Sequence, residues 1–121
     1  ETFSVDRMLP AVGQALVAAT CRADDAFARE LLGRASDVQG LACGKAERAF
    51  SRTLRGGCHA PVGGHAVVSG ATILMRGRVL SKDGAHVIDD AMDGLIGDAE
   101  ALGVSLARKM IERGAESLLR P

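Results

Sequence analysis

The sequence predicts an α+β fold in which helices pack on one face of a three-stranded antiparallel sheet. Three observations support it: a helical apolar pattern from about Asp37 to Leu54, extended segments joined by short turns after Pro61, and a helical pattern from Asp98 to near Gly114. Consecutive strands joined by short turns pair antiparallel, and helices beside such a sheet cover one of its faces. With 121 residues, the chain is expected to form one compact domain or slightly less.

The helix expected over about 37–54 is amphipathic. At 100° per residue, its apolar side consists of Ala42, Cys43, Ala46, Ala49, Phe50 and Leu54. Its other side consists of Gly44, Glu47, Arg48, Ser51 and Arg55. We therefore interpret Glu47 and Arg48 as helix-surface groups or as ion partners between domains, and we expect Gly56-Gly57 to end the helix.

The remaining elements are predicted from hydrophobic periodicity and from capping and turn residues. A short helix is expected to start at Asp24-Asp25, and Asp98 is expected to cap the last helix. Strands are predicted at roughly 64–68, 72–80 and 86–92, with turns at Ser69-Gly70 and Lys82-Asp83-Gly84. In the middle strand, apolar and polar residues alternate, which predicts that one face of the sheet is wet.

The opening stretch, residues 1–22, differs from the rest. It contains Ala15-Leu-Val-Ala-Ala-Thr-Cys21, an uncharged run of strand length. Such a run is typical of a strand that is buried on both faces, although a short buried helix has the same pattern. Because position 1 is Glu, we expect the natural N-terminus to lie upstream.

Composition excludes several classes of protein. The 15 basic residues balance the 15 acidic ones, so nothing indicates a nucleic-acid partner. No apolar run approaches the ~18 residues that a membrane span needs. The three cysteines are widely and irregularly spaced, which is typical of a reducing compartment rather than of a disulfide framework. No Cys or His spacing indicates a zinc site, and we expect no metal.

Cys58 is the candidate for chemistry. It follows two glycines at the expected end of a helix and precedes Pro61, so an exposed loop would hold it where its thiolate can react. The alternative is that Cys58 is a small buried apolar residue, as a lone cysteine in a small domain often is. The local pattern leaves both interpretations open.

An ordered set of motifs resembles the hydroxymethylbilane synthase (porphobilinogen deaminase) family. The motifs run along the whole chain: Met8-Leu-Pro-Ala-Val-Gly-Gln14, Cys21-Arg22, Ala46-Glu-Arg-Ala-Phe50, Gly56-Gly-Cys58, Pro61-Val-Gly63, Arg76-Gly77, Asp83-Gly84, Asp98-Ala-Glu-Ala-Leu-Gly103, Gly114-Ala115 and Leu118-Leu119. Gly-Gly-Cys alone is weak, but the ordered set is specific. The resemblance covers about the last two fifths of a typical family member.

The resemblance implies a transferase of haem and tetrapyrrole biosynthesis. In the family, the cysteine that matches Cys58 anchors a dipyrromethane cofactor through a thioether, and four porphobilinogen units are added to this primer before the linear tetrapyrrole is released. Gly57 and Gln14 are further candidates for contact with the cofactor. The family's catalytic aspartate and carboxylate-binding arginines match no motif here, so we expect no catalytic residue in this chain and no activity without the missing N-terminal domains. The resemblance also implies the cytoplasm, or a plastid in a photosynthetic eukaryote.

The resemblance also divides the chain into residues 1–22, the tail of the family's first α/β domain, and residues 23–121, the C-terminal α+β domain that carries the cofactor. Without the first domain, the Ala15–Cys21 strand is expected to pair with a second copy or to stay disordered. Three positions depart from the family pattern: Ala15, Arg55 and His59. The alternative function is that of a non-catalytic, stand-alone relative that acts as an interaction module.

Overall fold

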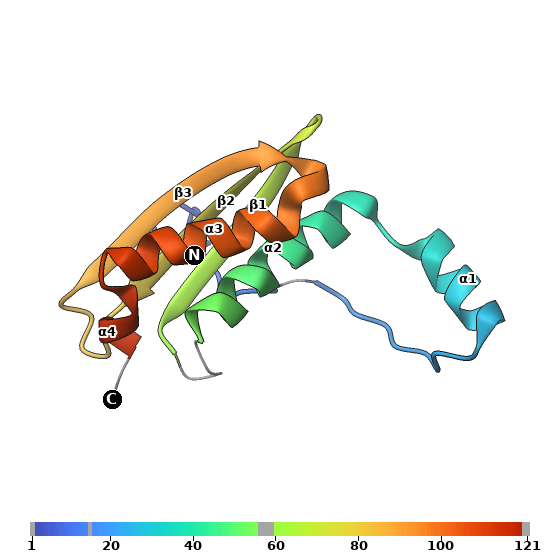
Figure 1. Ribbon diagram of the computed structural model, residues 1–121, viewed down its shortest axis with the longest axis horizontal. Coiled ribbons are helices and arrows are strands. Elements are labelled where there is room, and N and C mark those ends of the chain that lie inside the picture. The colour runs from blue at the N-terminus through green and yellow to red at the C-terminus, as the bar shows by residue number, and fades with distance from the viewer. Residues whose placement is uncertain (1, 15, 56–59, 120–121) are drawn as a thin grey trace.

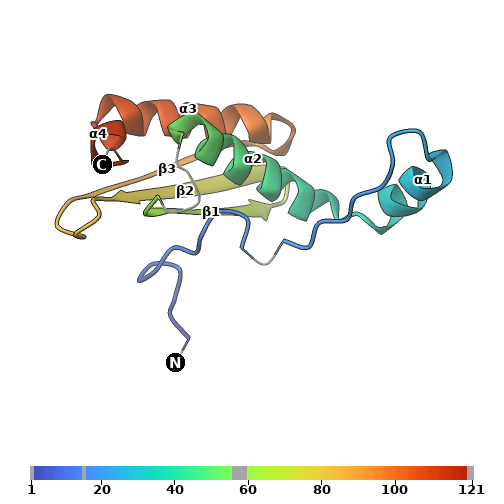
Figure 2. The same ribbon diagram turned by 90° about the horizontal axis from the view of Figure 1, so that it is seen from below.

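The computed structural model describes residues 2–14, 16–55 and 60–119 and confirms the α+β prediction. Two long helices lie on one face of a three-stranded sheet, and the N-terminal residues lie on the other side (Figures 1 and 2). In chain order the elements are α1 (Ala26–Ala35), α2 (Val38–Leu54), β1 (Val62–Ser69), β2 (Thr72–Leu80), β3 (Val87–Leu95), the 3₁₀ turn η1 (Ile96–Asp98), α3 (Ala99–Glu112) and α4 (Ala115–Leu119).

The sheet has the order β1-β2-β3, and both pairings are antiparallel. Met75 of β2 pairs with Ala66 of β1 and with Met92 of β3, so these three side chains share the helix-facing side. The middle strand has the predicted bounds, whereas β1 extends beyond the predicted 64–68 at both ends and β3 spans 87–95 rather than 86–92. The sequence did not predict η1 or α4.

The core lies between the sheet and the pair α2 and α3. Phe50 is fully buried against Gly77, where a Cβ atom would come within 2.7 Å of the Phe50 ring. Gly103 lets α3 approach the backbone of α2 at Ala46. The largest fully buried side chains are Phe50, Leu54, Ile73, Met75, Leu106, Met110 and Val79. The aliphatic composition thus forms a close-packed core around one phenylalanine.

The start of α1 and both ends of α2 lie close to their predicted positions, whereas the predicted cap of α3 does not form. The Asp25 side chain accepts a hydrogen bond from the Ala28 N–H at the start of α1, and the Asp37 side chain accepts from Gln39 and Gly40 at the start of α2. Asp98 precedes α3 but makes no side-chain cap, because the preceding 3₁₀ turn leaves its backbone non-extended. The structure ends α2 with Arg55 in the left-handed conformation, and Gly56-Gly57 lies outside the described residues.

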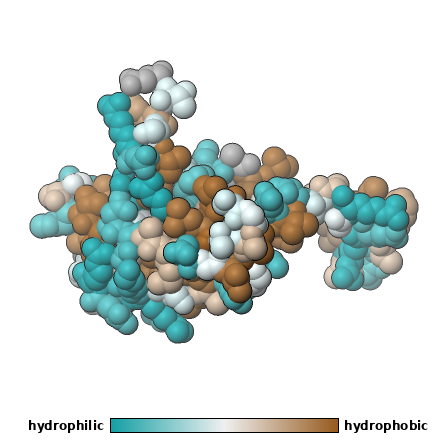
Figure 3. All heavy atoms as spheres, turned by 90° about the horizontal axis from the view of Figure 1, so that it is seen from above, coloured by the Kyte–Doolittle hydropathy of each residue, from teal (hydrophilic) through white to brown (hydrophobic). Residues whose placement is uncertain are grey.

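The predicted regular element at 15–21 is wrong for the described part of that run. Residues 16–22 form neither strand nor helix, and Val17 is fully exposed. A lone strand has no partner for its backbone groups and is not stable by itself. Beyond this run, α1 buries no residue, and its residues Phe27 and Leu31 are exposed. Figure 3 shows α1 as a separate group of spheres at the far end of the molecule.

Asp90 links β3 to α3. Its carboxylate accepts hydrogen bonds from Lys109 Nζ at 3.0 Å and from Arg113 Nη1 at 2.8 Å, and its side chain is 14% exposed. Burial raises the pKa of Asp90, but the hydrogen bonds from Lys109, the Ala91 N–H and Arg113 outweigh burial, so its pKa lies below the ordinary value.

The Asp90→Asn variant is therefore expected to lose about 1–2 kcal/mol of unfolding free energy at pH 7. Because the folded-state pKa is lowered, the contribution of Asp90 is present above the unfolded pKa of about 3.9 and is lost as pH falls through the folded-state pKa. Urea unfolding of both proteins from pH 7 downward should show the difference shrinking below about pH 4. A difference that stays constant to the lowest measurable pH would contradict this assignment.

Candidate functional site

Residues 4–14, here called the strap, dock on the outer edge of β1. Ala11 forms an antiparallel bridge with Gly63, and the Gly64 N–H donates to the Pro10 carbonyl at 3.0 Å. Leu9 is 7% exposed. The strap thus occupies one end of an otherwise open sheet edge, close to the start of β1.

Two glycines of β1 make room for the strap. A Cβ atom on Gly63 would lie 3.0 Å from Leu9 Cβ, and one on Gly64 would lie 3.0 Å from Val12 Cγ2. Any larger residue at either position would push the strap outward. The family motif Pro61-Val-Gly63 therefore has a structural reason in this chain.

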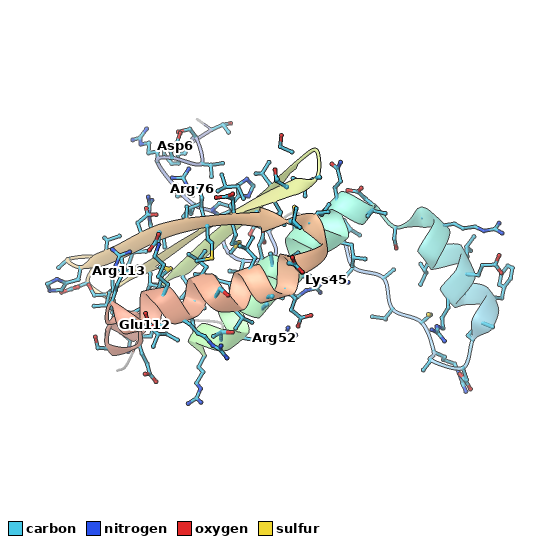
Figure 4. The ribbon with its side chains drawn as sticks, turned by 45° about the horizontal axis from the view of Figure 1, so that its top comes forward. Asp6, Lys45, Arg52, Arg76, Glu112 and Arg113 are labelled. Carbon is cyan, nitrogen blue, oxygen red and sulfur yellow. The ribbon has the colours of Figure 1, made fainter. Side chains whose placement is uncertain are left out.

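The strap also contacts the open face of the sheet. Asp6 forms an ion pair with Arg76 of β2, and Arg78 Nη1 donates to the Arg7 carbonyl at 3.5 Å. Figure 4 shows Asp6 lying over Arg76 on the side of the sheet away from the helices. Exposed ion pairs of this kind contribute little, so burial of Leu9 and the backbone pairing at β1 are the main anchors of this part of the strap.

Glu47 holds the far end of the strap, and its predicted place on the helix surface is wrong. It is 5% exposed. Its Oε2 accepts from the Gly13 N–H at 2.8 Å, and its Oε1 accepts from the Ala66 N–H at 2.9 Å. A carboxylate can be buried when hydrogen bonds replace its water. Arg48, by contrast, is exposed as predicted.

The sequence contained a signal for the burial of Glu47. On a helix, Glu47 stands four residues after Cys43 and three before Phe50, which both belong to the predicted apolar side. The charge of Glu47 placed it with the polar residues. Its backbone partners come from distant parts of the chain, which helical periodicity does not bring together.

A cavity of about 340 Å³ opens where the strap, β1 and β2 meet. Its lining consists of Arg7, Met8, Leu9, Ala11, Ala60, Pro61, Val62, Gly63, Arg78 and Leu80. Ala60 and Pro61 directly follow residues 56–59, which include Cys58 and are here called the Cys58 segment. The strap therefore lies next to one end of that segment.

The structure describes only part of the predicted site. Cys58 and Gly57, together with His59, lie outside the described residues. Their flanks are fixed: Leu54 is 2% exposed at the end of α2, and Pro61 is half-buried at the start of β1. Gln14 is exposed, directly after the residue that Glu47 binds.

The other cysteines are free thiols in different surroundings. Cys21 is exposed, whereas Cys43 is half-buried. Burial raises the pKa of the Cys43 thiol, and the Glu47 carboxylate raises it further. A protonated thiol is a poor nucleophile, so Cys43 is unsuited to covalent chemistry.

The described residues offer neither a metal site nor a membrane-spanning helix. Within residues 2–14, 16–55 and 60–119, no three His, Cys, Asp or Glu side chains are placed to hold a metal ion. No helix in the same part of the chain is long and apolar enough to cross a membrane.

The described surroundings of the Cys58 segment fit an attached acidic group. The cavity beside Ala60 and Pro61 combines apolar walls with the side chains of Arg7 and Arg78. Arg78 already pairs with Asp89, with its Nε 2.8 Å from Asp89 Oδ2. The cavity therefore offers apolar walls and two guanidinium groups, one of them already paired, near the segment, and it is open to solvent.

The fold and these contacts define a class of protein: a small α+β domain with a cysteine segment between a helix and the first strand, and a strap beside that segment. A family model described as the C-terminal domain of porphobilinogen deaminase matches residues 41–112. The porphobilinogen deaminase of Syntrophotalea carbinolica is 39% identical over 119 residues, which is 98% of this chain and 38% of that protein. The porphobilinogen deaminase of Carboxydothermus hydrogenoformans gives the same identity and coverage.

The chain therefore belongs to the porphobilinogen deaminase family and matches its C-terminal domain. It spans less than two fifths of the length of these curated relatives.

Proposed function

We propose that this chain is the C-terminal part of a hydroxymethylbilane synthase, a transferase that joins four porphobilinogen units into a linear tetrapyrrole. The observation that carries the proposal is the match over nearly the whole chain to proteins named porphobilinogen deaminase. The match includes the segment with Cys58, to which we assign the covalent attachment of a dipyrromethane primer. The chain alone is expected to be inactive, because the N-terminal domains hold the family's catalytic groups.

The residues of this chain would hold and orient the primer. Cys58 would anchor it through a thioether, which supplies a fixed end onto which units are added. Gly57 would let the backbone approach the primer closely. Gln14, at the end of the strap, would contact it from the other side. The fixed flanks at Leu54 and Pro61 support this proposal, since an anchor must not move with the growing chain.

The remaining assignments follow from the same proposal. Residues 1–22 would complete the first domain, with the 15–21 run joining its sheet, and residues 23–121 would form the C-terminal domain. In the absence of the first domain, the 15–21 run would pair with a second copy or stay disordered. We place the enzyme in the cytoplasm, or in a plastid if the source is a photosynthetic eukaryote.

Intact-mass measurement of the full-length protein tests the proposal. We expect a mass increase equal to two linked pyrrole units, located by peptide mapping on Cys58, and formation of hydroxymethylbilane from porphobilinogen. A full-length protein with an unmodified Cys58 and no product would contradict the proposal and would favour the non-catalytic relative.

A further inference from the structure

The outer edge of β3 carries backbone groups that point away from the sheet. In the part of the chain that the structure describes, the sheet has the order β1-β2-β3, so β3 pairs with β2 on one side only. At one end of this pairing, the Ser81 N–H donates to the His86 carbonyl at 2.9 Å. At the other end, the Ile96 N–H donates to the Ala71 carbonyl at 3.0 Å. Because hydrogen-bonded positions alternate along an antiparallel pair, the even-numbered residues of β3 bond to β2 and the odd-numbered residues face outward.

Side chains occupy the middle of this outer edge. The outward N–H of Ala91 donates to Asp90 Oδ1 at 2.8 Å, and the outward carbonyl of Asp89 accepts from Arg113 Nη1 at 3.1 Å. The same Arg113 nitrogen donates to Asp90 Oδ2 at 2.8 Å. Figure 4 shows Arg113 at the end of α3, next to β3. One carboxylate and one guanidinium thus bond a donor and an acceptor that a further strand would need.

The opposite edge of the sheet is closed in a comparable way. On β1, the outward N–H of Gly64 donates to the Pro10 carbonyl of the strap. The outward N–H of Ala66 donates to Oε1 of Glu47, which is buried. A carboxylate therefore bonds an edge N–H on β1, as Asp90 does on β3. Open edges let sheets pair with other chains, and here side chains or the strap bond the middle of both edges.

We propose that Asp90 and Arg113 close the outer edge of β3 against the addition of a strand from a second copy of the protein. Every copy carries the same nine-residue strand, so a second copy is the partner always present for such pairing. An incoming strand would bond to the Ala91 N–H and the Asp89 carbonyl. It would first have to displace the two side chains that already bond these groups.

Lys109 allows edge closure to be separated from charge. Its Nζ donates to Asp90 Oδ1 at 3.0 Å, whereas Arg113 bonds both Asp90 and the Asp89 carbonyl. The two cations are equally exposed, at 48% and 49%. Lys109→Ala and Arg113→Ala therefore each remove one cation from the same carboxylate. Only Arg113→Ala also uncovers a backbone group of the edge, so Lys109→Ala is the matched control.

Sedimentation velocity of the full-length protein tests the proposal with Arg113→Ala, Asp90→Ala and the control Lys109→Ala. The wild type and the control are expected to keep one sedimentation coefficient from about 1 to 100 µM, the range in which open strand edges cause association. The two edge variants are expected to form a larger species whose share grows with concentration.

Hydrogen exchange of the same proteins locates the contact. In dilute samples of Asp90→Ala, exchange of the Ala91 amide is expected to rise about tenfold to a hundredfold, because a hydrogen bond to a charged group is lost. In concentrated samples of both edge variants, exchange across 87–95 should fall again, because an added strand protects the outward amides. Exchange in β2 at the wild-type rate would show that the variants are folded.

Three results would overturn the proposal. The first is that folded edge variants keep the sedimentation coefficient of the wild type at every concentration. The second is that Lys109→Ala associates to the same extent, since the effect would then come from lost charge. The third is association without protection of residues 87–95. If Asp90→Ala does not fold, Arg113→Ala decides the matter, because its side chain is half exposed and leaves no buried carboxylate without its other partners.

Discussion

The Cys58→Ser variant of the full-length enzyme is expected to lose both tetrapyrrole synthesis and the covalent mass increase. A serine hydroxyl is a far weaker nucleophile than a thiol at neutral pH, because the reactive form of cysteine is its accessible thiolate. On the proposed function, no primer is then anchored and no chain can grow. Intact mass and an assay for hydroxymethylbilane measure the two losses separately.

Cys21→Ser and Cys43→Ala are the controls for this result. On the proposed function only Cys58 carries the primer, and the raised pKa of Cys43 keeps its thiol protonated, so neither change should affect loading or activity. If Cys58→Ser kept its mass increase and the adduct were found on another cysteine, the assignment of Cys58 would be wrong.

The Gly103→Ala variant is expected to have the largest effect on stability. A Cβ atom on Gly103 would lie 2.9 Å from the Ala46 carbonyl carbon and 3.1 Å from the Phe50 amide nitrogen, and it would overlap the Ala46 carbonyl oxygen. Backbone cannot move aside as a flexible side chain can, so α2 and α3 must separate. Overpacking of a core commonly costs 1–3 kcal/mol, and the backbone clash here predicts about 3 kcal/mol or more.

Urea unfolding of the variant and of Gly33→Ala tests this prediction. Gly33 is also helical, but nothing lies within 4 Å of the position of its Cβ. The better helix propensity of alanine should leave Gly33→Ala unchanged in stability or more stable by up to about 1 kcal/mol. Equal stability of Gly103→Ala and the wild type would contradict the close approach of α2 and α3.

Periodicity predicted most of the fold because each element carries its own pattern. The 72–80 strand has alternating side chains between two clear turns, and the structure gives it the predicted bounds. The helix expected over about 37–54 has an amphipathic pattern, and the structure confirms it as α2, with Asp37 as its cap. Such patterns involve only residues that are close in sequence, so they can be recognised without the structure.

Periodicity does not predict contacts between segments that are distant in sequence. Helical periodicity places Glu47 with the polar residues, whereas the partners that bury it, Gly13 and Ala66, stand 34 and 19 residues away. Residues 16–22 have the composition of a strand, but they pair with no strand in the part of the chain that the structure describes. An ordered set of motifs predicts the candidate site, whereas only the structure shows the contacts of the strap.

The docking of the strap bears on how chimeric enzymes should be made. The compact unit consists of two stretches of chain, the strap and residues 38–119, and the intervening α1 buries nothing. A crossover placed at the start of α2 would replace the helix but keep a foreign strap, and the two would have to fit at Gly63, Gly64 and Glu47. Recombination between family members should therefore exchange both stretches together, as one inherited unit.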